Sequence, residues 1–249
     1  MKYPNSSLQI IAGPCSAESR QQMMCTATAL HASGIRTLRA GLWKPRSRYG
    51  TFEGVGEKGL PWMQEIQQTL GMDILTEVAL PTHVEAVLRA GLDGVWIGAR
   101  TSVNPFMVNE IAEALRGTDL PVWVKNPVSP DLELWIGAIE RLQHAGIKKI
   151  SAIHRGFTLA DNTPYRNTPL WELADRISLS FPDIPIFCDP SHIAGNRSLI
   201  PNICRKALSL HADGFFIESH CCPEQALSDA AQQLTPADLS QLLETLHIR

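Results

Sequence analysis

The sequence predicts a (β/α)8 (TIM) barrel, and three observations carry this prediction. Eight short apolar segments rich in β-formers recur every 21 to 38 residues. Amphipathic helical segments lie between them, and five segments end in a glycine just before the next strand. Strands that are apolar on both faces are typical of buried parallel sheets. Eight strand–helix units in 249 residues fit a closed barrel better than an open sheet.

The predicted strands begin with LQIIAG near the amino end and finish with DGFFIES. In order along the chain they are residues 8–13, 35–40, 73–78, 94–99, 121–126, 148–156, 185–190 and 213–219. Only seven residues precede the first strand and three follow the last predicted helix. We therefore expect a single domain over residues 1–249.

Helices are predicted where apolar residues recur with the helical period, as over Glu18–Ser33, Pro105–Arg116 and Asp131–Ala145. The last helix, Thr235–Leu246, opens with a capping threonine followed by proline. Glycine favours the left-handed conformation that ends many helices. The glycines in that position are Gly34, Gly71, Gly91, Gly117 and Gly146.

Composition excludes several classes of protein. The net charge of −3 provides no general attraction for nucleic acid. The longest apolar runs are about five residues, too short to cross a membrane, and the amino end lacks a signal peptide. Six cysteines in so long a chain indicate reduced thiols rather than a disulfide framework. We therefore expect a cytoplasmic protein without a nucleic-acid or membrane partner.

Four potential metal ligands follow strands that barrel closure makes neighbours. Cys15 follows the first predicted strand, His192 the seventh, Glu218 closes the eighth, and Asp229 lies in the loop beyond. One sulfur, one nitrogen and two oxygen donors suit Mn, Fe, Co or Zn better than Mg or Ca. A buried thiol, a structural histidine and two solvated carboxylates are the alternative.

Six cations also fall at predicted strand ends, where barrel enzymes carry their active sites. They are Arg39, Lys44, Arg46, Arg100, Lys125 and Arg155. Like charges this close repel by about 1 to 4 kcal/mol per pair at 4 Å, so we expect bound phosphates or carboxylates among them. Salt bridges to loop carboxylates such as Glu53 and Glu77 are the alternative.

Several sequence blocks resemble the signatures of type I, β-branch 3-deoxy-D-arabino-heptulosonate-7-phosphate (DAHP) synthases. They occur in one order over nearly the whole chain: Ala12–Ser16, Arg39–Gly41, Lys44–Ser47, Ile97–Arg100, Asp189–His192 and Leu227–Asp229. The resemblance implies a metal-dependent transferase on a (β/α)8 barrel. Such an enzyme condenses phosphoenolpyruvate with erythrose 4-phosphate and releases phosphate, the first step of the shikimate pathway of aromatic amino-acid biosynthesis.

The resemblance also implies residue roles. One divalent ion would be held by Cys15, His192, Glu218 and Asp229, and would polarise the aldehyde. Phosphoenolpyruvate would be bound by Arg39, Lys44, Arg100, Lys125 and Arg155. The sugar phosphate would meet Arg46 and Ser47. Lys44 and Asp189 are expected at the reacting groups, with Asp189 close to the aldehyde, and Glu77 is expected either to orient the attacking water or to pair with a pocket cation.

Departures from the family pattern carry further expectations. Lys125-Asn126-Pro127 stands where many β-branch members have Lys-Arg-Gly. We expect no N-terminal regulatory extension like that of some relatives. The C-terminal chorismate mutase domain of a related subgroup is either missing from the protein or lies beyond this sequence. We expect a homo-oligomer, a dimer or tetramer, with feedback control from a possible separate chorismate mutase partner.

Three other functions stay open. A 3-deoxy-D-manno-octulosonate-8-phosphate synthase would use arabinose 5-phosphate, but its loop typically reads Lys-Ala-Asn-Arg-Ser-Ser, unlike Lys44–Ser47. A Schiff-base aldolase would use Lys125 as the nucleophile. A catalytically silent barrel would bind phosphorylated ligands without needing four metal donors.

Overall fold

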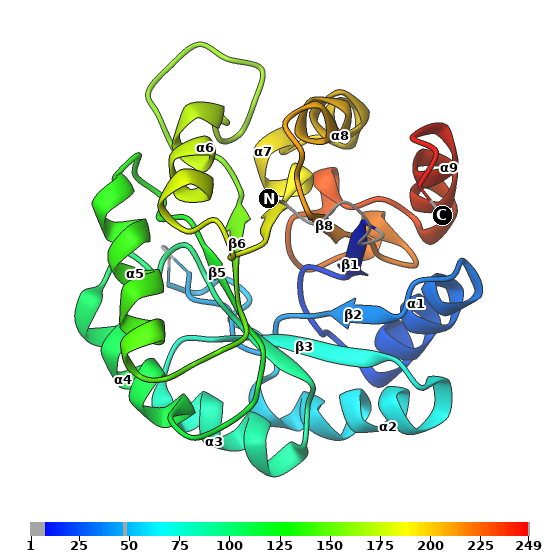
Figure 1. The fold of residues 1–249 in the computed structure, drawn as a ribbon. Helices are drawn as coiled ribbons and strands as arrows, with labels where there is room; N and C mark the ends of the chain where they lie inside the picture. The colour runs from blue at the N-terminus through cyan, green and yellow to red at the C-terminus, as the bar shows by residue number, and fades with distance from the viewer. Residues whose placement is uncertain (1–7, 47–48, 249) are drawn as a thin grey trace.

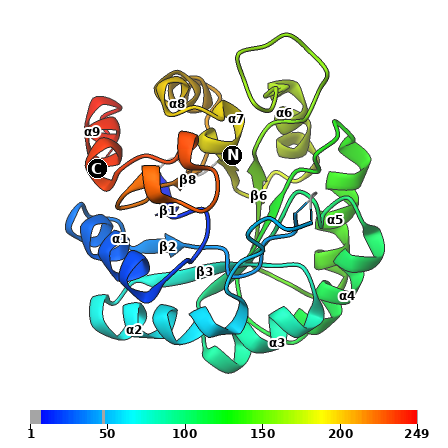
Figure 2. The same cartoon turned by 180° about the vertical axis from the view of Figure 1, so that it is seen from behind.

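The computed structural model describes residues 8–46 and 49–248. In this part of the chain, eight parallel strands pair in sequence order, and β8 pairs back with β1 to close a barrel (Figures 1 and 2). The strands are β1 (Gln9–Gly13), β2 (Thr37–Arg39), β3 (Asp73–Val78), β4 (Gly94–Ile97), β5 (Val122–Lys125), β6 (Ile150–His154), β7 (Ile186–Cys188) and β8 (Gly214–Glu218). Each lies within its predicted segment, so the predicted fold is confirmed.

Helices surround the barrel (Figure 1). They are α1 (Arg20–Ala32), α2 (Leu60–Leu70), α3 (Pro81–Ala90), α4 (Pro105–Leu115), α5 (Leu132–His144), α6 (Trp171–Ser180), α7 (Pro190–Ala194), α8 (Ile200–Ser209) and α9 (Pro236–Thr245). Short 3-10 turns are η1 (Gly56–Gly59), η2 (Arg197–Leu199), η3 (Pro223–Gln225) and η4 (Ala230–Gln232). None of the helices described here is long and apolar enough to span a bilayer.

Side-chain caps explain where several of the helices begin. The helix predicted from Glu18 starts two residues later, because the Ser19 side chain accepts a hydrogen bond from the Gln22 amide and so caps α1. The last helix has the predicted cap: Thr235 and Asp238 bond each other's backbone amides. All five glycines predicted at helix ends have positive φ angles.

The interior of the barrel is filled by side chains. Ile11, Leu75, Trp96, Trp123, Ile153, Phe187 and Phe216 form one buried cluster. The Trp96 ring meets the Phe216 ring edge-on at 5.1 Å. A second, larger core lies between the strands and the helices around them. Because the barrel is solid, a substrate has access only at its ends, and polar side chains gather at the carboxyl ends of the strands.

Replacing Asp131 by alanine is expected to destabilise the protein by about 1 kcal/mol, because Asp131 caps α5. Its side chain accepts a hydrogen bond of 3.1 Å from the Leu134 amide. Thermal unfolding followed by circular dichroism measures the loss. Asp131→Ser is the matched control, since a hydroxyl oxygen also accepts this bond and should recover most of the stability. Equal losses in both variants would contradict the capping role.

Candidate active site

A polar pocket lies at the carboxyl ends of the strands. Its lining residues are Lys44, Pro45, Arg46, Glu77, Gly98, Ala99, Arg100, Lys125, Arg155, Arg166, His192 and Asp229. The structure thus brings five of the six predicted cations to one cavity. Arg39, the sixth, is fully buried and does not line the pocket.

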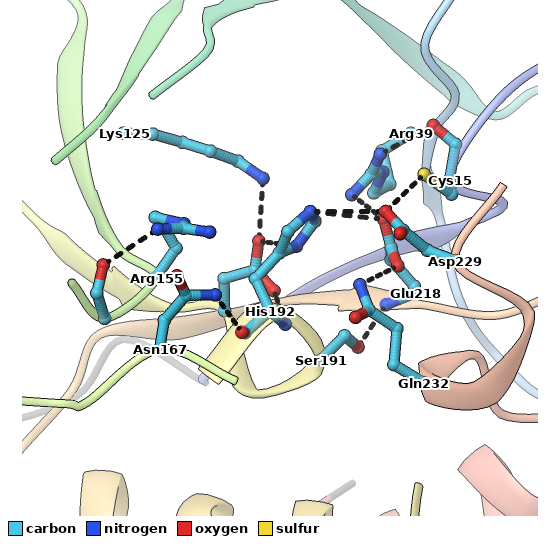
Figure 3. A network of polar contacts seen from close by, with 12 residues as sticks. Cys15, Arg39, Lys125, Arg155, Asn167, Ser191, His192, Glu218, Asp229 and Gln232 are labelled. Carbon is cyan, nitrogen blue, oxygen red and sulfur yellow. Dashed lines mark hydrogen bonds and ion pairs between the residues drawn. The ribbon is translucent and has the colours of Figure 1, made fainter. Parts of the chain in front are cut away.

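Three of the four predicted metal ligands form a tight group. The Cys15 sulfur and one carboxylate oxygen each from Glu218 and Asp229 all lie within 4.8 Å of one another. The Cys15 thiol donates to Asp229 Oδ2 at 3.3 Å. Burial and the nearby Glu218 carboxylate raise the pKa of this thiol to about 12. Figure 3 shows the three side chains converging from the β1 and β8 ends of the barrel.

His192 reaches the same group from α7. Its Nε2 lies 3.8 Å from Glu218 Oε1 and 4.0 Å from Asp229 Oδ2. Its Nδ1 lies 2.8 Å from Asp189 Oδ2, so the imidazole stands between this carboxylate and the other three potential ligands. The donor set of thiol, imidazole and two carboxylates fits a borderline divalent cation. The four residues expected from the sequence are therefore brought together.

Asp189 is buried and holds two neighbours at once. Its Oδ1 accepts a hydrogen bond from the His192 amide and so caps α7, the short helix that carries His192. Its Oδ2 pairs with Lys125 Nζ at 2.7 Å (Figure 3). Burial opposes ionisation, but the neighbouring His192 and Lys125 side chains outweigh it and hold the pKa of Asp189 well below its usual value.

Arg39 lies beneath the pocket rather than in it. Its Nη1 pairs with Glu218 Oε1 at 3.3 Å, and its Nη2 donates to the Cys15 carbonyl at 3.1 Å. The guanidinium carbon lies 4.7 Å and 4.8 Å from the centres of the Trp96 and Phe216 rings. We call Cys15, His192, Glu218 and Asp229 the metal-ligand group. This group and the cations, which are predicted from the sequence as two separate sets, are joined through the buried Arg39–Glu218 ion pair.

The remaining cations surround the open part of the pocket. Lys44 Nζ lies 3.6 Å from Glu77 Oε2. This salt bridge is the role predicted for Glu77 as the alternative to orienting the attacking water. Burial lowers the pKa of Arg155 to about 10. Arg46 donates to the Phe52 carbonyl at 2.8 Å. Ser47 lies outside the described residues.

Sequence reasoning missed several residues that build the site. Asn126, a departure from the family pattern, accepts from the Arg155 amide at 2.7 Å and donates to the Gly156 carbonyl, and so holds β5 and β6 together. Gln232 donates to Glu218 Oε2 at 2.7 Å. Arg166 pairs with Asp229 at 2.8 Å from a loop that carries no strand or helix signal. Each contact joins residues from two different elements or loops, so the spacing of residues along one element does not predict it.

Comparison with known proteins identifies close relatives. The family model for the DAHP synthetase I family matches residues 4–247. The phospho-2-dehydro-3-deoxyheptonate aldolase of Thermotoga maritima is 34% identical over 234 residues, which are 94% of this chain and 67% of the relative. The 2-dehydro-3-deoxyphosphooctonate aldolase of Protochlamydia amoebophila is more distant, at 27% identity over 96% of this chain and 90% of the relative.

Solved structures agree with the sequence comparison. The crystal structure of the Thermotoga maritima DAHP synthase has a TM-score of 0.86 and 32% identity, and the match covers 96% of this chain and 68% of that one. A truncated form of the same synthase has a TM-score of 0.81 at 30% identity, over 96% of this chain and 85% of that one. Sequence, fold and site geometry lead to one assignment: the chain belongs to the DAHP synthetase I family.

Proposed function

We propose that this protein condenses phosphoenolpyruvate with erythrose 4-phosphate to give DAHP and phosphate, as a 3-deoxy-7-phosphoheptulonate synthase. The observation that carries the proposal is the meeting of Cys15, Glu218, Asp229 and His192 beside a pocket lined by five of the predicted cations. Family membership supports the same reaction. The more distant similarity to a 2-dehydro-3-deoxyphosphooctonate aldolase does not favour the longer sugar phosphate.

In this proposal, those four residues hold one divalent ion, of Mn, Fe, Co or Zn. When bound, such an ion supplies Lewis-acid polarisation of a carbonyl oxygen. Lys44, Arg100, Lys125 and Arg155 bind phosphoenolpyruvate through its phosphate and carboxylate, and Arg46 with Ser47 binds the phosphate of the sugar. Holding both substrates in one orientation removes much of the entropic part of the barrier.

The chain's own acidic residues then take different roles. Carbon 3 of phosphoenolpyruvate attacks the aldehyde carbon, water adds at carbon 2, and phosphate leaves. We infer that Glu77, which lines the pocket and pairs with Lys44, orients that water when substrate is bound. Asp189 is engaged with Lys125 and His192, so we assign it to positioning these two groups instead of to direct contact with the aldehyde. Arg39 similarly holds Glu218.

The Lys125–Asp189 ion pair also bears on the Schiff-base alternative. A Schiff base needs a neutral amine. The carboxylate 2.7 Å from Nζ favours the charged ammonium, but burial outweighs it and lowers the pKa of Lys125. Borohydride treatment with substrate tests this point. We expect no trapped adduct on Lys125, and a trapped adduct would favour the aldolase mechanism.

Phosphate release from phosphoenolpyruvate tests the proposed function. We expect release with erythrose 4-phosphate and little with arabinose 5-phosphate. Chelation should abolish release, and Mn, Fe, Co or Zn should restore it. A preference for arabinose 5-phosphate would assign the chain to the other synthase, and binding without turnover under all conditions would identify a silent barrel.

Assembly and location are further parts of the proposal. We infer a homo-oligomer, dimer or tetramer, and possible feedback control through a separate chorismate mutase, on the resemblance to the family alone. A cytoplasmic location is supported by the six cysteines, which are all free thiols. Gel filtration with the partner, together with inhibition by prephenate, tests the regulatory part. Separate peaks and unchanged inhibition would refute it.

A further inference from the structure

Arg166 lies in the loop between β6 and α6, which extends beyond the helices at the top of Figure 1. Its Nη1 donates to Asp229 Oδ1 at 2.8 Å and to Gln232 Oε1 at 2.7 Å. Asp229 and Gln232 belong to the loop after β8, so this arginine joins two loops that are distant along the chain. The Arg166 side chain is 42% exposed. Of its two partners, Asp229 is itself a potential metal ligand, and Gln232 contacts another, Glu218.

The two carboxylate oxygens of Asp229 have different partners. Oδ1 receives the Arg166 guanidinium, while Oδ2 faces the Cys15 thiol at 3.3 Å and His192 Nε2 at 4.0 Å. The Asp229 backbone has a φ of 53°, a conformation that is uncommon outside glycine and needs support from its surroundings. Gln232 extends the network, since its side-chain amide donates to Glu218 Oε2.

The same loop is also docked on α7, the helix that carries His192. The Arg166 and Asn167 amides donate to the Ala194 and Ile193 carbonyls at 3.4 Å and 3.3 Å. The Asn167 side chain donates to the His192 carbonyl at 2.7 Å (Figure 3). Gly195 leaves the room that this docking needs, because a Cβ there would lie 2.4 Å from Arg166 Cβ. The backbone of Arg166 is therefore fixed on α7, and from this position its guanidinium contacts Asp229.

We propose that Arg166 is a positioning residue for the divalent cation: it fixes Asp229 so that one carboxylate oxygen faces Cys15 and His192. This inference rests on the proposed metal site and names a residue that acts on the ion only through Asp229. Partners of metal ligands typically change metal affinity 10- to 100-fold when they are removed. Arg166 also lines the pocket beside Lys44, Arg100, Lys125 and Arg155, so the test measures phosphoenolpyruvate affinity as well as metal affinity.

The test is a titration of metal-stripped, full-length protein with Co²⁺. The thiolate-to-cobalt absorption reports ligation by Cys15, and a competing chelator gives the dissociation constant. We expect Arg166→Gln to weaken Co²⁺ binding about 10- to 100-fold. Arg166→Lys, which keeps the charge but not the two-acceptor geometry, should fall between this variant and the wild type.

Arg197→Gln is the matched control. Arg197 also holds the loop after β8, through the Ala230 carbonyl at 3.2 Å and Glu224 at 3.1 Å, and neither of these partners is one of the four metal donors. Its Co²⁺ affinity should therefore equal that of the wild type. Gly195→Ala is a second variant that displaces Arg166 without removing its charge and should also weaken Co²⁺ binding. Because it also strains the left-handed end of α7, which carries His192, its result counts only together with that of Arg166→Lys.

Three outcomes would overturn the inference. Arg166→Gln could bind Co²⁺ as tightly as the wild type, or could lose phosphoenolpyruvate affinity with Co²⁺ affinity unchanged, which would place Arg166 in the substrate site. Arg197→Gln could weaken Co²⁺ binding equally, which would indicate general loosening of the loop. If Arg166→Gln lacks a cooperative melting transition, Arg166→Lys and Gly195→Ala decide the matter. Wild-type protein that binds no Co²⁺ would refute the metal site itself.

Discussion

Cys15→Ala is expected to abolish turnover and to weaken divalent-cation binding by more than about 100-fold, because it removes the only sulfur donor of the metal-ligand group. Phosphoenolpyruvate binding should stay largely intact. The contacts of Arg39 and Lys44 with Cys15 use its backbone carbonyl, at 3.1 Å and 3.0 Å, and alanine keeps that carbonyl. Calorimetry with phosphoenolpyruvate and the phosphate-release assay measure the two effects separately.

Cys25→Ala is the control for loss of a thiol, since Cys25 is exposed on α1, away from the four donors. It should retain both turnover and metal affinity. Parallel loss of phosphoenolpyruvate and metal binding in Cys15→Ala would mean that the two sites are one. Full activity of Cys15→Ala would exclude the thiol as a ligand.

Arg39→Met is expected to lower the free energy of unfolding by about 3–5 kcal/mol, because it leaves Glu218 as a buried carboxylate without its cation. Both side chains are at most 1% exposed, so water cannot replace the lost partner. For a domain of this size the melting temperature should fall by roughly 6–20 °C. The loss should also remove turnover, since Glu218 is one of the metal-ligand group.

A double variant separates the lost charge pair from lost packing. Arg39 also stacks between Trp96 and Phe216, and methionine keeps part of that contact. Glu218→Gln in the Arg39→Met background removes the uncompensated charge and should recover part of the stability, without recovering activity. A double variant that is as unstable as the sum of the two single variants would show that the ion pair is not the cause.

The strands and most of the helix ends could be predicted because their causes are local. Apolar runs, the Thr235 cap and glycines such as Gly34 act within a few residues of the chain. The short helix α7 was not predicted: its five residues are too few for a periodic pattern, and it depends on the Asp189 cap. Proximity to a strand end placed His192 in the right region but did not show that a helix presents it.

The site was predictable to the level of which residues gather, but not of how they pair. A position at a strand's carboxyl end does not distinguish a side chain that lines the pocket from one that lies beneath it, so the burial of Arg39 could not be predicted. Its pairing with Glu218 depends on the tilt of the strands and on the two aromatic rings beside it. Arg166 lies in a loop without periodicity, and only the folded chain places it beside Asp229.

The placement of Asp189 has a consequence for protein engineering. One carboxylate orients both an imidazole of the metal-ligand group and the ammonium of Lys125. Random libraries that vary position 189 would perturb metal choice and substrate choice together, so that neither trait could be selected by itself. Libraries aimed at a new sugar phosphate should keep Asp189 constant and diversify the pocket around Arg46, which in the described part of the chain contacts none of the four metal-ligand residues.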